Sequence, residues 1–402
     1  MLHEETNKMT TLIEQIQQEF QNLPAVFELA KQAVLNQEGL VSYKARHPLF
    51  QIDPFHDLLQ NEWYTEEEYA LLLVQEAEEI NLEFEKLYEF WVDPKTQRIC
   101  HRIQYYENNN RAETVFEYKD DYHKSLGLSM YGKRILLEKV CYLVFKNGFP
   151  DFYLECSHSG VLSKKYRIEN NRVSGYYETH TFFSYTADAV FEYDASDNID
   201  RIKRHVKYMN AESPRWPEVV FKRPDPDLSL ETAFKIMEDF LVARITNDLL
   251  QRVRIPEEVY CLLLEYCMPE AFPPELCIGV VSDLESPFEE LNLSQLYFSG
   301  GCRYESYEGT LPVDLYEEKM QEFYLLYYRA YDQKEYKKQT FEYWDERIKQ
   351  LYLKVCQRLM HVDFSPSFTT SKQFLVLAKE GSNFDVEYSH EHMFAYKKEQ
   401  NL

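Results

Sequence analysis

The residues up to Asn36 space their apolar side chains as helices do. Apolar residues recur three and four positions apart: Leu12, Ile13, Ile16, Phe20, Val26, Phe27, Ala30 and Val34. Pro24 interrupts this pattern, and a proline inside a helix removes a hydrogen bond and clashes with the preceding turn. We therefore expect two short helices, or one helix that is kinked at the proline.

A further helix is predicted from Thr65. Thr65 and Glu68 have the spacing of a capping box, in which two side chains satisfy backbone N–H groups at the start of a helix. Apolar residues continue the stripe to Ile80. The other face of this helix is acidic, with these carboxylates in and around it: Glu62, Glu66, Glu67, Glu68, Glu76, Glu78, Glu79, Glu83 and Glu85.

Between residues 86 and 205 the apolar side chains alternate with polar ones, as in β-strands. Strand-like words such as RICHRIQYY and RAETVFEY are separated by turn words such as DPKT and ENNN. Such short connections predict an antiparallel meander. Glu192 stands between Phe191 and Tyr193, and similar alternation elsewhere leads us to expect a sheet with one face exposed to water.

The word VFEY occurs twice in this region, in Thr114–Asp121 and in Ala189–Ser196. The two copies lie at unequal distances from the Glu and Asn runs that precede them, which excludes a strict tandem repeat. Two explanations remain. The segments could descend from an ancient duplication, or the match could arise because strands and turns favour the same residue types. The sequence does not tell whether the two strands are neighbours.

A boundary is predicted at Ala211–Ser229, where four prolines interrupt the periodicity. Ser229 is a favourable N-cap for the helix that follows. Pro256 suggests the start of another helix through PEEVYCLLLEYCM. The remaining segments predict a strand at 274–285, amphipathic helices at 315–330 and 334–361, a strand at 372–380 and, less clearly patterned, a strand at 384–394.

Together these elements predict an α+β protein. We expect N-terminal helices at 1–84, a mainly antiparallel β-meander sheet at 85–210, a linker at 211–228 and a helix-rich α+β domain at 229–402. A chain of 402 residues is longer than a single hydrophobic core usually sustains, so several domains are the natural expectation.

Composition limits the classes of partner. The chain has a formal net charge of −24, which disfavours nucleic acid and anionic membrane surfaces as partners because both would repel it. Basic proteins remain compatible. Aromatic residues make up 15% of the chain, and Tyr and Phe favour both sheets and binding interfaces.

Cysteine usage and the N-terminus point to the cytoplasm. The eight cysteines are scattered without a CxxC pair, as expected for reduced and mostly buried thiols. The N-terminal residues lack the basic and apolar regions of a signal peptide, and no apolar run reaches the length of a membrane span. We therefore expect a cytoplasmic protein.

Several residue groups could carry chemistry, but each has an ordinary structural explanation. His390 and His392 would share one face of a strand and hold zinc only with a third ligand, which the spacing does not supply. Cys156 and His158 could pair as thiol and base, but no orienting acid accompanies them. The glycine pair 300–301 lacks the residues of a phosphate-binding loop. We expect no catalytic residue, metal or cofactor.

The acidic face of the predicted helix after Thr65 is the candidate binding site. Concentrated carboxylates next to aromatic residues are suited to docking a basic partner, since complementary charge steers association and aromatic side chains anchor it. A solvated surface is the structural alternative. The residues that we assign to partner binding are Trp63, Glu66, Glu67, Glu78 and Glu79.

The stretch Leu351–Asp385 resembles the end of small bacterial domains found among the immunity proteins of polymorphic toxin systems. The resemblance rests on a helix that ends in a Leu, Asp and aromatic word, a threonine loop and a Phe-x-Val-x-Ala strand: Leu359, Asp363, Phe364, Thr369, Thr370, Phe374, Val376 and Ala378. It covers under a tenth of the chain. It implies a non-enzymatic protein that neutralises a toxin by binding it.

The leading hypothesis is therefore an acidic, cytoplasmic binding protein that neutralises a basic partner, a toxin if the resemblance holds. The alternative is an unrecognised enzyme, or a protein that binds a metal or small ligand in a pocket between sheet and C-terminal helices, with His158, His180 or His390 as titrating group. A third reading, a structural subunit, rests on the tyrosine-rich segment Phe323–Tyr331.

Overall fold

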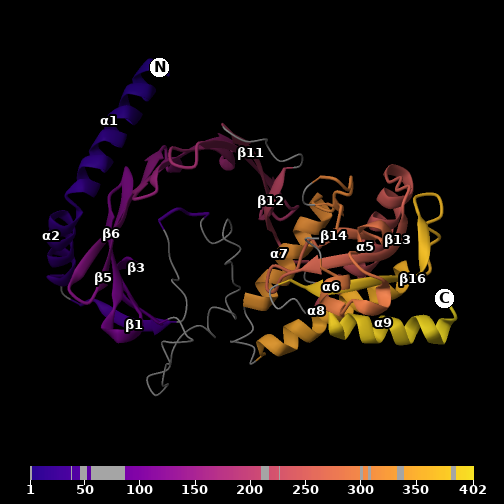
Figure 1. Cartoon of the computed structure of the whole chain (residues 1–402). Coiled ribbons are helices and arrows are strands. Elements are labelled where there is room, and N and C mark those ends of the chain that lie inside the picture. Colours follow the sequence, from indigo (N-terminus) through magenta and orange to yellow (C-terminus); the bar gives the residue numbers. More distant parts are fainter. Residues whose placement is uncertain are drawn as a thin grey trace. The chain divides into compact units, whose positions relative to one another are not determined.

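The computed structural model describes residues 2–37, 39–45, 52–55, 87–209, 217–225, 227–298, 302–306, 309–332, 339–381 and 386–402. The chain divides into two compact units, Met1–Arg223 and Pro224–Leu402. Each unit combines helices with a β-sheet, so the predicted α+β class is confirmed (Figure 1). None of the helices in the described parts is both long and apolar enough to cross a membrane.

The first unit is built on a sheet of twelve strands. Their order in space is their order in the sequence, and every neighbouring pair is antiparallel, as the meander prediction requires. The strands are β1 (Val41–Ala45), β2 (Leu87–Asp93), β3 (Arg98–Tyr105), β4 (Arg111–Tyr118), β5 (Tyr122–Tyr131), β6 (Arg134–Lys146), β7 (Phe149–Ser157), β8 (Gly160–Glu169), β9 (Arg172–His180), β10 (Tyr185–Tyr193), β11 (Ile199–Tyr208) and β12 (Glu218–Lys222).

Tight turns connect the strands and explain their antiparallel pairing. Asn147 and Gly148 join β6 to β7, and both have positive φ angles, which suits the two-residue turns of twisted hairpins. Between β2 and β3, the Asp93 carboxylate accepts a hydrogen bond from the backbone N–H of Lys95 at 2.9 Å. The turn word DPKT therefore acts as the sequence predicts.

Two helices cover one face of this sheet. Helix α1 (Leu2–Gln21) ends and α2 (Leu23–Leu35) begins beside Pro24, so the prediction of two short helices is confirmed. Their apolar side chains pack against Val140 and Leu154, among other buried residues. Figure 1 shows both helices on the outer side of a curved sheet.

The expectation of a single wet face is wrong for the central strands. Cys141 and Leu143 alternate with Val140 along β6 and are buried on the opposite face, where Ile52 packs against the same cluster. The exposed apolar side chains Tyr177 and Val190 lie farther along the sheet, on β9 and β10. The alternation of apolar and polar residues in the sequence shows which side chains point to the same face of the sheet. It does not show which distant segments of the chain cover each face.

The two VFEY words lie on β4 and β10, which are not neighbours in the sheet. The shared word therefore does not mark two strands that pair with each other.

Part of the predicted linker belongs to the sheet. Residues 218–222 form β12 and pair with β11, because the short word EVVFK continues the strand pattern. The N-terminal helices belong to the same compact unit as the sheet.

The second unit contains a four-stranded sheet in the order β15-β14-β13-β16, with β13 and β16 parallel and the other pairs antiparallel. Its elements are α5 (Leu230–Arg252), β13 (Glu258–Tyr266), β14 (Glu275–Val280), η2 (Val281–Asp283), η3 (Phe288–Glu290), α6 (Leu293–Leu296), β15 (Tyr304–Glu305), α7 (Glu318–Asp332), α8 (Phe341–Leu359), β16 (Thr369–Glu380) and α9 (Glu387–Gln400).

Most predicted elements of this unit are present. The Ser229 side chain caps α5 by accepting a hydrogen bond from the Thr232 backbone N–H at 3.2 Å. The helix expected after Pro256 is instead the central strand β13. Every residue from Val259 to Leu264 is buried, and a strand covered on both faces reads as a continuous apolar run that resembles a helix.

Strand β16 departs from regular pairing near its start. Thr370 lies opposite Val259 and Leu375 lies opposite Cys261, so residues 371–374 bulge out between them. Helix α9 supplies side-chain partners along this strand. The Ser389 hydroxyl accepts a hydrogen bond from the Ala378 backbone N–H at 2.9 Å, and Lys397 donates to the carbonyl oxygens of residues 372 and 374.

Candidate functional site

The structure does not place the residues that we assigned to partner binding. Trp63, Glu66, Glu67, Glu78 and Glu79 lie outside the described residues, as do the capping box and the glycine pair 300–301. Their role in binding stays a prediction from the sequence.

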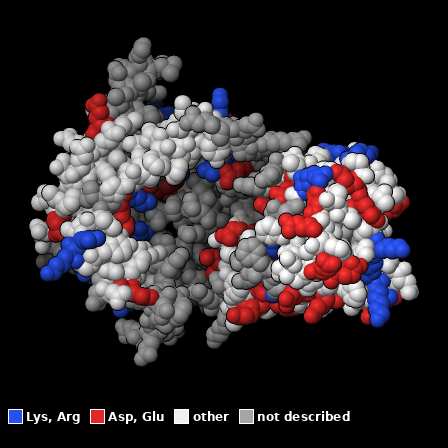
Figure 2. Space-filling view, viewed as in Figure 1, with Lys and Arg blue, Asp and Glu red and all other residues white. Residues whose placement is uncertain are grey.

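The described surface carries a second concentration of acid, in the second unit. Between Arg254 and Arg303 the sequence has nine Asp and Glu residues and no Lys or Arg. They lie on β13, β14 and the loops around these strands: Glu257, Glu258, Glu265, Glu270, Glu275, Asp283, Glu285, Glu289 and Glu290. Figure 2 shows groups of Asp and Glu over this unit.

Three of these carboxylates have basic partners. Arg303 pairs with Glu257 at 2.5 Å and also with Asp283, and Lys379 pairs with Glu265 at 3.6 Å. These pairs join the loop after β14 and strand β16 to β13. They therefore hold the unit together and leave the other acidic side chains of the stretch to face solvent or one another.

Glu275 lies directly opposite Glu265 in the β13–β14 pair. Burial, together with the charge of Glu265, raises the pKa of Glu275. Like charges on facing positions destabilise a sheet, so this arrangement has a cost for folding. Lys379, which lies 3.6 Å from Glu265, offsets part of the repulsion.

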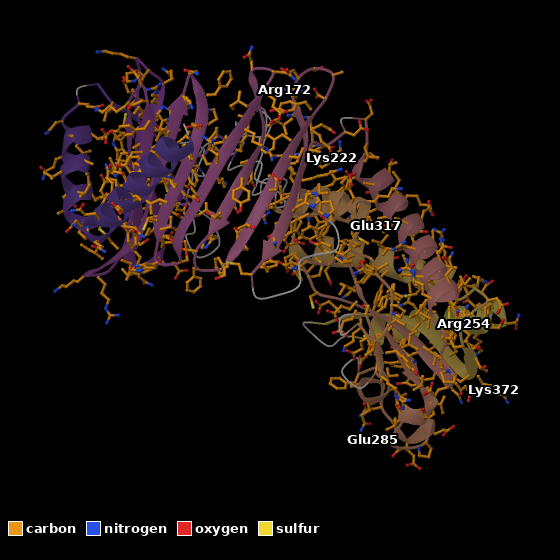
Figure 3. All side chains as sticks on the ribbon, turned by 90° about the horizontal axis from the view of Figure 1, so that it is seen from above. Arg172, Lys222, Arg254, Glu285, Glu317 and Lys372 are labelled. Carbon is orange, nitrogen blue, oxygen red and sulfur yellow. The ribbon has the colours of Figure 1, made fainter. Side chains whose placement is uncertain are left out.

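An acidic loop, Glu285–Glu290, presents carboxylates beside an aromatic ring. Glu285, Glu289 and Glu290 are exposed, whereas the Phe288 ring packs edge-on against Tyr260 with centroids 5.6 Å apart. Figure 3 shows Glu285 at the margin of the second unit. This aromatic contact packs the loop against β13.

In the first unit, a buried ionic network lies on the sheet face opposite the helices. Lys164 donates to Asp53 at 2.6 Å, and Tyr166 donates to the same carboxyl at 2.9 Å. Glu178 lies 3.8 Å from Lys164 and 3.7 Å from Arg204. Asp53, Lys164 and Glu178 are all buried, so strands β8, β9 and β11 are joined through charges shielded from water.

This network anchors residues 52–55 to the sheet. Burial would raise the pKa of Asp53, but the Lys164 ammonium and the hydrogen bonds from Lys164, Phe55 and Tyr166 outweigh it and lower the pKa. The Phe55 ring packs against Phe191 at 4.9 Å. The buried charges are paired with one another, so removing one partner would leave the other charge buried and unpaired, which strongly destabilises a fold.

The two C-terminal histidines lie on a helix and do not share one face of a strand. The expected strand at 384–394 is wrong, since His390 and His392 lie on α9. Side chains two positions apart share a face on a strand but point in different directions on a helix. His390 stacks with Phe394 at 5.9 Å, and burial lowers its pKa. Nowhere in the described parts of the chain do three or more His, Cys, Asp or Glu side chains gather so that they could hold a metal.

The cysteine and the other histidines also have structural partners. Burial raises the pKa of Cys156, which disfavours a reactive thiolate. His158 lies in the turn after β7 with its ring 5.4 Å from Phe20, and His180 contacts Phe183 at 4.7 Å. Neither arrangement brings a base to the thiol.

Two hollows in the second unit are large enough to hold small molecules. A groove of about 280 Å³ lies between α5 and α8, where Arg347 pairs with Glu231 at 2.7 Å and covers the Phe234 ring. A larger cavity of about 650 Å³ lies at the bulge of β16. In the groove Arg347 pairs with Glu231 and Lys235 with Glu238, whereas the cavity joins an apolar floor to a polar rim.

Comparison with known proteins gives no relative. No family description, curated protein or solved structure matches the chain. Function therefore has to be argued from the surfaces and cavities described above.

Proposed function

We propose that this protein is a non-enzymatic binding protein that holds a basic protein partner through the carboxylates and aromatic side chains of its surface. The observation that carries the proposal is the stretch between Arg254 and Arg303, whose sequence has nine acidic residues and no Lys or Arg. Arg303 and Lys379 pair with three of the nine carboxylates, and Glu285, Glu289 and Glu290 of the acidic loop are exposed. A solvated protein surface normally mixes both signs of charge.

Electrostatic complementarity explains what such a surface does. An acidic region of a chain with net charge −24 attracts cations over roughly a Debye length, about 8 Å at physiological salt, and so raises the rate of encounter with a basic protein. The half-buried Phe288 ring within the acidic loop offers an apolar contact at its centre. Aromatic residues framed by polar ones are typical of binding hot spots.

The resemblance of Leu351–Asp385 to immunity-type domains supports a more specific form of the proposal. In this form the partner is a toxin, and the chain neutralises it in the cytoplasm by occupying its basic surface. The predicted face around Glu67 and Glu78 and the acidic loop are the two candidate docking positions.

A purified partner allows a decisive test. The tagged chain is used to capture proteins from its native lysate at low salt, and any basic protein released by rising salt is purified for kinetic measurements. We expect the association rate to fall steeply with salt. The double variant Glu289→Lys and Glu290→Lys should slow association about tenfold or more, because four units of charge change at the contact.

The matched control reverses Glu391 and Glu399 on α9, which are also exposed and give the same change in net charge. If both double variants slow association equally, the effect comes from the net charge of the chain, and the acidic loop is not the contact. If only Glu67→Lys and Glu78→Lys slow association, docking belongs to the first unit. If no basic protein is captured, the proposed function is wrong.

A further inference from the structure

The cavity at the bulge of β16 joins residues from three elements. Its walls come from the connection between α8 and β16, from the first residues of β16 and from the end of α9. Its volume of about 650 Å³ lies within the range of small-molecule sites, which is roughly 300–1,000 Å³.

The floor of the cavity is apolar and aromatic. Phe364, Phe368 and Phe374 are all buried, and their ring centroids are 5.2 to 6.3 Å apart. Three packed rings form a rigid surface that needs no rearrangement to accept a flat or branched apolar group. Such preorganisation lowers the entropic cost of binding.

The rim is polar and carries more positive than negative side chains. Thr369, Thr370 and Lys372 are exposed on the strand side, and Lys397 lies opposite on α9. Asp363 is the acidic side chain of the lining, and its carboxylate accepts a hydrogen bond from the Ser365 backbone N–H at 3.0 Å. The cavity wall thus has two lysine side chains and one aspartate side chain, and Leu402 lines it as well.

One of the two lysines is held beside the bulge. Residues 371–374 leave the ladder with β13, and the Lys397 ammonium donates to the carbonyl oxygens of residues 372 and 374 at 2.8 and 3.0 Å. A lysine ammonium has three N–H donors, so one remains for a ligand after these two bonds. β-Bulges commonly occur where a strand must re-aim groups toward a site.

We propose that this cavity is a binding site for a small amphipathic anion, with an apolar ring or branched chain on the phenylalanine floor and a carboxylate or sulfonate at Lys372 and Lys397. The site lies apart from the acidic loop and does not depend on the proposed function. Of the eight residues that carry the resemblance of Leu351–Asp385, five line this cavity: Asp363, Phe364, Thr369, Thr370 and Phe374.

Anilinonaphthalene sulfonate tests the proposal on the full chain, since it combines an aromatic body with one negative group and fluoresces in apolar sites. We expect saturable binding to one site. Thr370→Trp fills the cavity from its exposed wall. It should weaken binding roughly tenfold or more, because the probe then loses apolar contact with the cavity. Lys372→Gln should weaken it about two- to fivefold, the range of an exposed charge pair.

Lys398→Gln is the matched control, because Lys398 is exposed on α9 and does not line the cavity. It should leave the affinity unchanged. Neutral phenylnaphthylamine should bind more weakly than the sulfonate and should not respond to Lys372→Gln. The proposal is overturned if Thr370→Trp binds the sulfonate as tightly as the unaltered chain, or if Lys372→Gln and Lys398→Gln have equal effects.

Discussion

At the scale of single residues, the most demanding positions are buried charges that depend on partners far away in the sequence. Glu113 on β4 is inaccessible to water and contacts Lys31 of α2, His101 of β3 and Arg111. These contacts lie beneath the helices that cover the sheet. A carboxylate at such a position stabilises the fold only while it is ionised and paired.

We expect Glu113 to make the first unit sensitive to acid. Burial would raise its pKa, but hydrogen bonds from His101 and Lys31 and the nearby positive charges lower it from 4.5 to about 2. A carboxyl whose pKa is lowered by folding stabilises the protein above its unfolded pKa. That stabilisation is lost as pH falls from about 4.5 toward 2.

The variant Glu113→Gln should therefore lose about 3 kcal/mol of unfolding free energy at neutral pH, as expected when one partner of a buried pair is removed. The difference from the unaltered chain should shrink as pH falls below 4.5. Urea denaturation followed by circular dichroism at several pH values measures both effects. Glu117→Gln, on the same strand but only partly buried, is the control. A difference that does not depend on pH would contradict this account.

Sequence reasoning found few of these residue contacts. Ser229 could be predicted as a cap because its partner Thr232 lies three residues away. The pair between Asp53 and Lys164 joins residues 111 positions apart, and no local pattern marks it. The two histidines of α9 were misread because the polar segment around them shows little apolar periodicity, although Tyr388 and His392 have helical spacing.

At the scale of elements, helix α9 protects an edge of the small sheet. Strand β16 pairs only with β13 in the described sheet, so its other side would expose backbone groups to pairing with another chain. Ser389 and Lys397 of α9 satisfy groups on that side. Side chains of α9 thereby take the hydrogen-bonding positions that a neighbouring strand would otherwise fill.

Removal of the Ser389 hydroxyl tests this role. Ser389→Ala leaves the Ala378 backbone N–H without its partner in a buried position, which should cost about 1 to 2 kcal/mol. Hydrogen exchange of the Ala378 amide should become faster, while exchange in β14 stays the same. Ala395→Ser, at an exposed position of the same helix, is the control. Unchanged exchange at Ala378 would show that α9 does not protect this strand.

Elements were predictable where one face differs from the other. The meander and helices α7 and α8 could be anticipated because their apolar side chains follow a clear period, whereas α5 was anticipated from its N-cap Ser229. Strand β13 could not, because burial on both faces removes the period from its sequence. The bulge of β16 was also hidden, since it depends on how this strand meets β13.

At the scale of the whole molecule, the chain consists of two units with separate cores. The large core of the second unit draws its buried residues from Ala233 to Met393, and the three clusters of the first unit lie between Ile16 and Phe221. No buried cluster in the described residues combines side chains from both units. Each unit therefore has the apolar contacts that it needs to fold.

We expect residues 224–402 to fold when produced alone. The fragment should melt cooperatively and keep its helical circular dichroism, since the capped helix α5 and the four-stranded sheet are contained within it. A fragment that begins at Leu241 loses the start of α5 and serves as the destabilised control. If residues 224–402 are unfolded in isolation, the two units depend on each other for stability.

The strictly sequential order of the twelve strands has a consequence for biosynthesis. From β2 to β12 each strand pairs only with the strands that precede and follow it in the chain, so each of these pairings closes a short loop, whereas residues 46–86 separate β1 from its partner β2. As the chain leaves the ribosome, each strand after β2 meets an edge that is already in place, and this part of the sheet can grow by one strand at a time. Along β2 to β12, each new strand therefore finds its partner in the strand that was made just before it.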